Sequence, residues 1–446
     1  MEGADKQAAW SRFFRSEATG SILLLICTLT ALIWANSPWS AAYFQILNTK
    51  IGFAWNGSTF ILGFDHWIND GLMAVFFFVV GLELKREIVV GRLSTLKKAI
   101  LPVAGAFGGM IAPALIYSTF NHGVEGARGW GIPMATDIAF ALGILALLGP
   151  QVPKELKVFL AALAIADDLG AVLVIAFFYT DQLYLGPLLG AALGLALIAG
   201  AARLKVKSIF VYAVLVAGVW LGIFASGIHA TVAGVLVAMV VPVRSRIESG
   251  SFLTLAREQL AELEAGGLGE ARLKAEQIEV LERLQQTTSE VVPAGLAFER
   301  YLHPVTAYAI LPLFALFNAG VALDRGIGDA LQSRVFFGVL LGLVIGKQAG
   351  IMLAIWIVVR FRVASLPDGI TWAHVHACSV LAGIGFTMAI FLTDLAFADR
   401  GLIATSKLVI LAASVICAGG GYLLMRRALN RAIVRGAAPR LPVAAN

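Results

Sequence analysis

The sequence predicts an all-α polytopic membrane protein with about twelve transmembrane helices. Of the 446 residues, 59% are hydrophobic and only 14% are charged, whereas soluble domains are about 25% charged. The mean hydropathy is +0.84. Apolar segments close to the ~20 residues that cross a hydrocarbon core also recur along the chain. Their approximate ranges are 18–36, 68–91, 98–120, 131–149, 155–179, 183–201, 207–223, 227–243, 302–323, 333–358, 372–394 and 402–425.

Lysine and arginine are distributed unevenly between the two ends of these predicted spans. If the N-terminus is cytoplasmic, most basic residues of the short connections and of the C-terminal segment fall on the cytoplasmic side. The positive-inside rule therefore predicts that both termini are cytoplasmic. The formal net charge of +6 follows from this arrangement. No patch of basic and aromatic residues indicates a nucleic-acid partner.

One segment interrupts the apolar pattern. Residues 244–300 contain seven Lys/Arg and ten Glu, and their apolar residues recur at the three- and four-residue spacing of amphipathic helices. The segment is either a regulatory or oligomer contact or a solvated cytoplasmic linker, and the composition favours the linker. The expected organisation is a cytoplasmic tail (1–17), spans one to eight (18–243), this linker (244–300), spans nine to twelve (301–425) and a basic cytoplasmic tail (426–446).

Two adjacent aspartates, Asp167 and Asp168, lie in the middle of the apolar run Val158 to Thr180. A charge at the centre of a transmembrane helix costs about 2.5–3.5 kcal/mol on translocon scales. Ionisable groups at that depth usually belong to an ion or proton pathway. The pair is therefore the leading candidate for a functional site.

Two of the predicted spans contain helix-breaking residues in corresponding positions of the two halves. The fourth opens with Gly131-Ile-Pro-Met-Ala-Thr136-Asp137, and the eleventh contains Gly383-Ile-Gly385-Phe-Thr387. Interrupted spans of this kind indicate the midplane binding site of a transporter, although glycine also serves close helix packing. We expect Asp137 to neutralise the N-termini of the broken helices and Lys347 to neutralise their C-termini.

Four ionisable groups are thus expected at membrane depth: Asp137, Asp167, Asp168 and Lys347. Lys347 can pair with only one carboxylate, and neighbours on a helix point about 100° apart, so the two adjacent aspartates need different surroundings. Carboxylate oxygens together with backbone carbonyls and the Thr136 hydroxyl suit a small hard cation. The same oxygens bind protons, so cation and proton would exclude one another at a single site.

Seven motifs carry a specific resemblance. The sequence resembles the NhaA family of bacterial Na⁺/H⁺ antiporters over almost its whole length, apart from 244–300 and both tails. The motifs are GLELKRE (81–87), MATDIAFALG (134–143), AIADDLGAV (164–172), ASGIHATVAGV (225–235), LPLFALFNAGV (311–321), IGKQAGI (345–351) and GIGFTMAIF (383–391).

The resemblance implies roles for the site residues. Asp168 matches the family's principal cation ligand, and Asp167 matches the acid that pairs with the lysine, here Lys347. Thr136 and Asp137 match the crossing of two unwound helices. The implied activity is electrogenic exchange of two protons for one Na⁺ or Li⁺ in the bacterial inner membrane, without a cofactor. The protons are carried either by both aspartates, or by one aspartate and Lys347.

The resemblance also implies inverted repeats, with helices three to five related to helices ten to twelve. It further implies alternating access and a homodimer supported by an external hairpin within 37–66. A pH-responsive group is expected near the cytoplasmic side, although surface ion pairs would explain the same charges. Arg300 departs from the family, since a histidine stands there in the best-studied members. The residues of this group are Glu83, Lys85, Arg86, Glu87, Glu299, Arg300 and His303. His229, in the short link before the eighth span, separately matches a residue that affects the pH response in the family.

Other classes of membrane protein fit the sequence less well. A sodium-coupled solute symporter also uses broken helices, but it needs a larger pocket for an organic substrate. An intramembrane aspartyl protease takes its two aspartates from different helices, and a channel needs a repeated ring or a carbonyl filter. The sequence contains no phosphate-binding loop of the kind that binds ATP. The sequence therefore favours a transporter over an enzyme.

Overall fold

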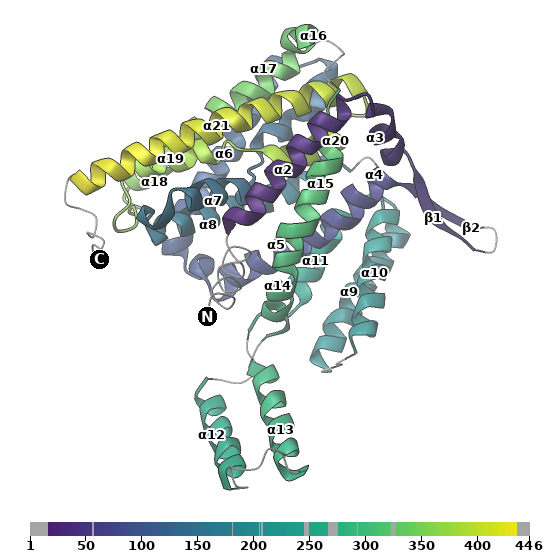
Figure 1. The fold of residues 1–446 in the computed structure, drawn as a ribbon, viewed down its shortest axis with the longest axis vertical. Coiled ribbons are helices and arrows are strands. Elements are labelled where there is room, and N and C mark those ends of the chain that lie inside the picture. The colour runs from purple at the N-terminus through teal and green to yellow at the C-terminus, as the bar shows by residue number, and fades with distance from the viewer. Residues whose placement is uncertain are drawn as a thin grey trace, which may run out of the picture.

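The computed structural model confirms the predicted all-α class, with one small β-hairpin (Figure 1). It describes residues 17–434 apart from 56–57, 181, 205, 207, 245–248, 266–274, 292 and 323–326. The expected N-terminal tail therefore lies almost entirely outside the described residues, as does the end of the C-terminal tail. The last helix continues beyond the expected limit of 425 to Val434.

Among the described residues, seven helices are long and apolar enough to cross a membrane, or up to nine if each of two bent pairs forms one span. The number of twelve spans stays a prediction. The helices of the first half are α2 (Glu17–Ala35), α3 (Ser40–Leu47), α4 (Phe64–His66), η1 (Trp67–Leu72), α5 (Met73–Val89), η2 (Arg92–Ser94), α6 (Leu96–Asn121), η3 (Glu125–Met134), α7 (Ile138–Leu147), η4 (Gly149–Gln151), α8 (Lys154–Phe178), α9 (Leu185–Arg203), α10 (Ile209–Ala225) and α11 (Thr231–Val240).

The second half begins with the charged segment and returns to apolar helices. The candidate span that corresponds to the expected ninth runs from Ala294 to Asn318, so it begins inside the segment expected as linker. The helices are α12 (Ser249–Ala265), α13 (Ala275–Val291), α14 (Ala294–Val305), η5 (Thr306–Ile310), α15 (Leu311–Asn318), α16 (Ile327–Gln332), α17 (Arg334–Leu341), η6 (Gly342–Gly346), α18 (Lys347–Arg360), α19 (Trp372–Leu381), α20 (Phe386–Ala396) and α21 (Arg400–Val434).

A two-stranded β-hairpin lies between α3 and α4. Strand β1 (Lys50–Trp55) pairs antiparallel with β2 (Ser58–Gly63). Trp67 ties the hairpin to η1, because its indole Nε1 donates to the carbonyl of Ile51 at 3.0 Å. The hairpin projects from the side of the helical bundle (Figure 1).

Helices α12 and α13 form a second projection, which stands apart from the other helices in Figure 1. The two helices pack on one another, and Val280 is buried between them. The guanidinium of Arg283 on α13 lies 3.2 Å from the carboxylate of Glu262 on α12. Residues 266–274, between the two helices, lie outside the described residues. A solvated linker stays the prediction for this segment.

The centre of the bundle is held together by close backbone contact between α6 and α18. Gly108 and Gly350 face one another so closely that a Cβ on either would collide with the carbonyl oxygen of the other. Small residues at such crossings let membrane helices pack by van der Waals contact. This contact fixes α18, whose first residue is Lys347, against α6.

A π-helical turn, η6, directly precedes Lys347. The backbone N–H of Lys347 donates to the carbonyl of Gly342, five residues earlier, rather than four. The side chain of Gln348 donates to the carbonyl of Val344 in the same turn. Single π-turns of this kind are frequent at functional sites.

Candidate cation and proton site

Two non-helical stretches cross in the centre of the bundle. The first, residues 135–137, separates the 3₁₀-helix η3 from α7. The second, residues 382–385, separates α19 from α20, whose axes differ in direction by 46°. Each stretch therefore brings unpaired backbone groups and two helix ends into the interior.

The two stretches satisfy one another's polar groups. The backbone N–H of Asp137 donates to the carbonyl of Ile384 at 2.6 Å. The hydroxyl of Thr136 donates to the carbonyl of Ala382 at 2.9 Å. Thr136 is fully buried, so these bonds are shielded from competing water. The crossing is therefore a specific, hydrogen-bonded contact between distant parts of the sequence.

Asp137 stabilises the N-termini of two helices at once. One carboxylate oxygen accepts from the N–H of Phe140 in the first turn of α7 at 3.0 Å. The other accepts from Thr387 in the first turn of α20, at 3.1 Å from the backbone N and 2.5 Å from the hydroxyl. An anion at a helix N-terminus is favourable because N–H groups and the helix dipole point toward it. The sequence analysis did not include Thr387 as a partner of Asp137.

Lys347 and Asp167 form a fully buried ion pair. The ammonium Nζ lies 2.6 Å from Asp167 Oδ2, and the two side chains are 0% and 1% exposed. The same ammonium donates to the carbonyl of Met134, the last residue of η3. Lys347 thus places a positive charge at a helix C-terminus, where carbonyl dipoles favour it.

Asp168 is next to this pair but has no comparable partner. It is 1% exposed, and its Oδ1 accepts no hydrogen bond from the described residues. The charges of Asp167, Asp137, Lys347 and Glu83 all act on it. An unpartnered carboxylate oxygen at this depth is costly unless it binds a proton or a cation.

No group of three or more His, Cys, Asp or Glu side chains among the described residues is arranged to hold a resident metal ion. A transported cation at Asp167 and Asp168 would need further oxygens. The backbone carbonyls and the Thr136 hydroxyl at the crossing are of the hard oxygen type that such cations prefer.

Several of the charged residues expected at the cytoplasmic side lie together. The guanidinium of Arg86 on α5 is 3.2 Å from Glu299 on α14 and 3.5 Å from Glu87. The charge of His303 also acts on Glu299, while Arg300 is exposed. This cluster ties α5 to the start of α14. Helix α14 itself begins at Ala294, directly after its N-cap Pro293, inside the segment expected as linker.

Lys85 has a different role from its neighbours. Its ammonium donates to the carbonyls of Met239 and Val241 at 2.6 and 2.5 Å. These carbonyls belong to the last turn of α11 and its cap. Lys85 therefore caps α11, as basic side chains often do at helix C-termini.

His229 lies far from this cluster, before the opposite end of α11. Its Nδ1 is 3.4 Å from Oδ1 of Asp70, whose Oδ2 is 3.3 Å from Nδ1 of His66. The hydrogen bond to Asp70 raises the pKa of His66 above its ordinary value. Sequence reasoning missed His66, because nothing in the local pattern places it beside His229.

Known proteins match this chain over nearly its whole length. The family described as "Na+/H+ antiporter 1" matches residues 11–425. The chain is 44% identical over 421 residues to a Na(+)/H(+) antiporter NhaA of Oleidesulfovibrio alaskensis, covering 94% of both chains. It is 43% identical over 413 residues to a Na(+)/H(+) antiporter NhaA of Wolinella succinogenes, covering 92% of this chain and 91% of that one. The chain therefore belongs to the Na⁺/H⁺ antiporter 1 family.

Proposed function

We propose that this protein exchanges Na⁺ or Li⁺ for protons at Asp167 and Asp168, and that the exchange moves net charge. Cytoplasmic cation would leave the cell as external protons enter. The membrane is the bacterial inner membrane, with both termini in the cytoplasm. Na⁺/H⁺ exchange follows from the family, whereas the site and the charge movement are inferred from the residues.

The observation that carries the proposal is the unequal state of the two aspartates. The Oδ1 atoms of both aspartates have no partner among the described residues, but Oδ2 of Asp167 is paired with Lys347 at 2.6 Å, whereas Asp168 has no such ion pair in the described part of the chain. Both are buried. One acid is therefore neutralised internally, and the other can be neutralised by a proton or by a cation, but not by both at once.

Cation binding would also release the second proton. A cation that uses Asp167 as well as Asp168 must displace the ammonium of Lys347 from the ion pair. An ammonium without its carboxylate is unfavourable in a buried site and loses its proton. Two protons would then leave for each monovalent cation that binds. Each uncompensated charge gains about 2.3 kcal/mol per 100 mV of membrane potential.

The crossing gives this site a means of alternating access. Short helices that end at a midplane site can tilt as one unit, exposing the site first to one side and then to the other. Asp137 and Lys347 would keep the helix ends neutral throughout this movement. The Arg86–Glu299 cluster would adjust the response to cytoplasmic pH, and the β-hairpin would support a homodimer.

The test uses inverted membrane vesicles that contain the protein, acidified by respiration and monitored with a fluorescent ΔpH dye. Added NaCl or LiCl should restore fluorescence, whereas KCl should not. Asp168→Asn should abolish the response. Asp399→Asn is the matched control, because Asp399 is exposed directly before α21, and it should retain exchange.

Two results would contradict the proposal. Near-normal exchange by Asp168→Asn would remove that residue from the site. The absence of a response in the wild-type protein between about pH 6.5 and 9, a range that begins at the ordinary histidine pKa, would instead favour a sodium-coupled solute symporter. Charge movement is tested separately in proteoliposomes, where an imposed membrane potential should change the exchange rate.

A further inference from the structure

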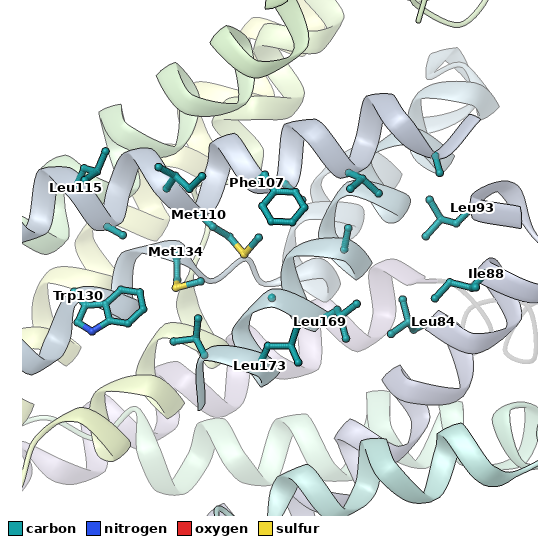
Figure 2. Close-up of a pocket in the computed structure, with 18 of the residues that line it drawn as sticks. Leu84, Ile88, Leu93, Phe107, Met110, Leu115, Trp130, Met134, Leu169 and Leu173 are labelled. Atoms are coloured by element: carbon teal, nitrogen blue, oxygen red, sulfur yellow. The ribbon is translucent and has the colours of Figure 1, made fainter. Parts of the chain in front are cut away.

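A long apolar groove lies beside the candidate site and has no role in the exchange proposed above. It has a volume of about 680 Å³, and its walls come from α5, α6, η3 and α8. Figure 2 shows Phe107 and Met110 on one wall, opposite Leu84 and Leu169. The lining is apolar almost throughout, so the groove offers no set of partners for a polar ligand.

The groove follows α6 for most of that helix. Its lining begins near Ala99 and reaches Ser118. At about 1.5 Å per residue, this stretch is about 28 Å long, close to the ~30 Å thickness of a hydrocarbon core. The groove is open on one side, since Phe107 is 57% and Leu115 62% exposed. Its open side therefore faces the region that lipid chains fill.

A basic residue stands beside one end of the groove. Lys98 is exposed and directly precedes the lining residue Ala99. Trp130 and Ser118 line the opposite end. A single apolar groove with a basic end matches an anionic phospholipid, whose acyl chains are apolar and whose phosphate is negative.

We propose that this groove binds an acyl chain of an anionic phospholipid, with the headgroup phosphate at Lys98. Such lipids are abundant around a membrane protein, so the groove would be filled during normal function. Each methylene moved from water into an apolar site is worth about 0.8 kcal/mol, but a bilayer is already apolar. A preference for anionic over other phospholipids must therefore come from the headgroup.

The bound chain would lie directly behind the two aspartates. Gly170, two residues after Asp168, lines the groove, and Met110 packs so closely on it that a Cβ would collide with the sulfur. Met134, whose carbonyl accepts from Lys347, lines the groove as well. The lipid would thus fill the space between α5 and the helices that carry the site. Lipid binding itself does not require exchange activity.

The experiment reconstitutes the full chain into vesicles that contain a phosphatidylglycerol with a photoreactive diazirine on its acyl chain. After illumination, labelled peptides are identified by mass spectrometry. Labelling should concentrate on α6 and α8, and unlabelled phosphatidylglycerol should compete better than phosphatidylethanolamine. Lys98→Gln should weaken the binding of the anionic lipid about fivefold, the effect of losing one lysine near a lipid surface.

A second variant tests the groove itself. Ala114→Phe places a ring inside the groove and should remove most of the labelling there. Leu193→Phe is the matched control, since Leu193 is exposed on α9, outside the groove, and should leave labelling unchanged. Labelling spread evenly over all exposed apolar faces would overturn the proposal. The proposal would also be overturned if a zwitterionic analogue labelled the groove as strongly as the anionic lipid and if Lys98→Gln left the labelling unchanged.

Discussion

Replacing Lys347 by Met should strongly destabilise the protein, because it leaves a buried carboxylate without its counter-ion. The Lys347 and Asp167 side chains are 0% and 1% exposed and 2.6 Å apart. Removing one member of such a pair typically costs about 3–5 kcal/mol. The carbonyl of Met134 also loses its donor, which adds to the cost. At about 2 °C per kcal/mol for a large chain, Tm should fall by roughly 6–10 °C.

The double variant Asp167→Asn with Lys347→Met separates the effect of an unpaired Asp167 carboxylate from the other effects of losing the lysine side chain. It removes both charges, and replacing a buried ion pair by neutral groups is often nearly neutral. Tm is measured by fluorescence-detected unfolding in detergent. The double variant should therefore have a higher Tm than Lys347→Met, closer to the Tm of the wild type. A double variant whose loss equals the sum of the two single losses would refute the reasoning, since the two side chains would then not interact.

Three further predictions follow from the remaining contacts. Na⁺ should raise the Tm of the wild-type protein but not of Asp168→Asn, because a ligand stabilises only the state that binds it; an equal rise in both would place the cation elsewhere. Thr387→Val removes the hydroxyl that donates to Asp137 and should cost about 1.5–3 kcal/mol, measured as a loss in Tm, whereas Thr387→Ser should retain most of the stability. His66→Gln should lower Tm at pH 6 but not at about pH 9. The raised pKa of His66 stabilises the fold below the ordinary value of about 6.5, and this contribution is lost as pH rises through the folded value; a Tm loss that does not change with pH would contradict it.

Much of the fold could be predicted because its signals are local. The all-α class followed from apolar runs of membrane-spanning length, and α8 with its two aspartates could be located directly in one of them. The two amphipathic helices of the 244–300 segment also followed from spacing alone, and the structure has them as α12 and α13. Local signals suffice where one helix face or one apolar run decides the structure.

Partners that are distant in sequence could not be predicted from such signals. Asp137 accepts from Thr387, 250 residues later, and only the tertiary fold decides which hydroxyl meets that carboxylate. Lys85 was grouped with its charged neighbours, yet it caps the end of α11. Helical geometry separates it from Arg86 by about 100°, so adjacent charges in the sequence serve different contacts.

The π-turn η6 before Lys347 contains one residue more than the corresponding turn of an α-helix. Every side chain after η6 is turned by about 100° relative to a continuous α-helix. The direction of Lys347 toward Asp167 therefore depends on the length of the chain upstream, and not on the identity of the lysine alone. Deleting a single residue from Gly342–Gly346 would leave the lysine in the sequence but aim it at a different neighbour. The number of residues in η6 therefore helps to determine the geometry of the site.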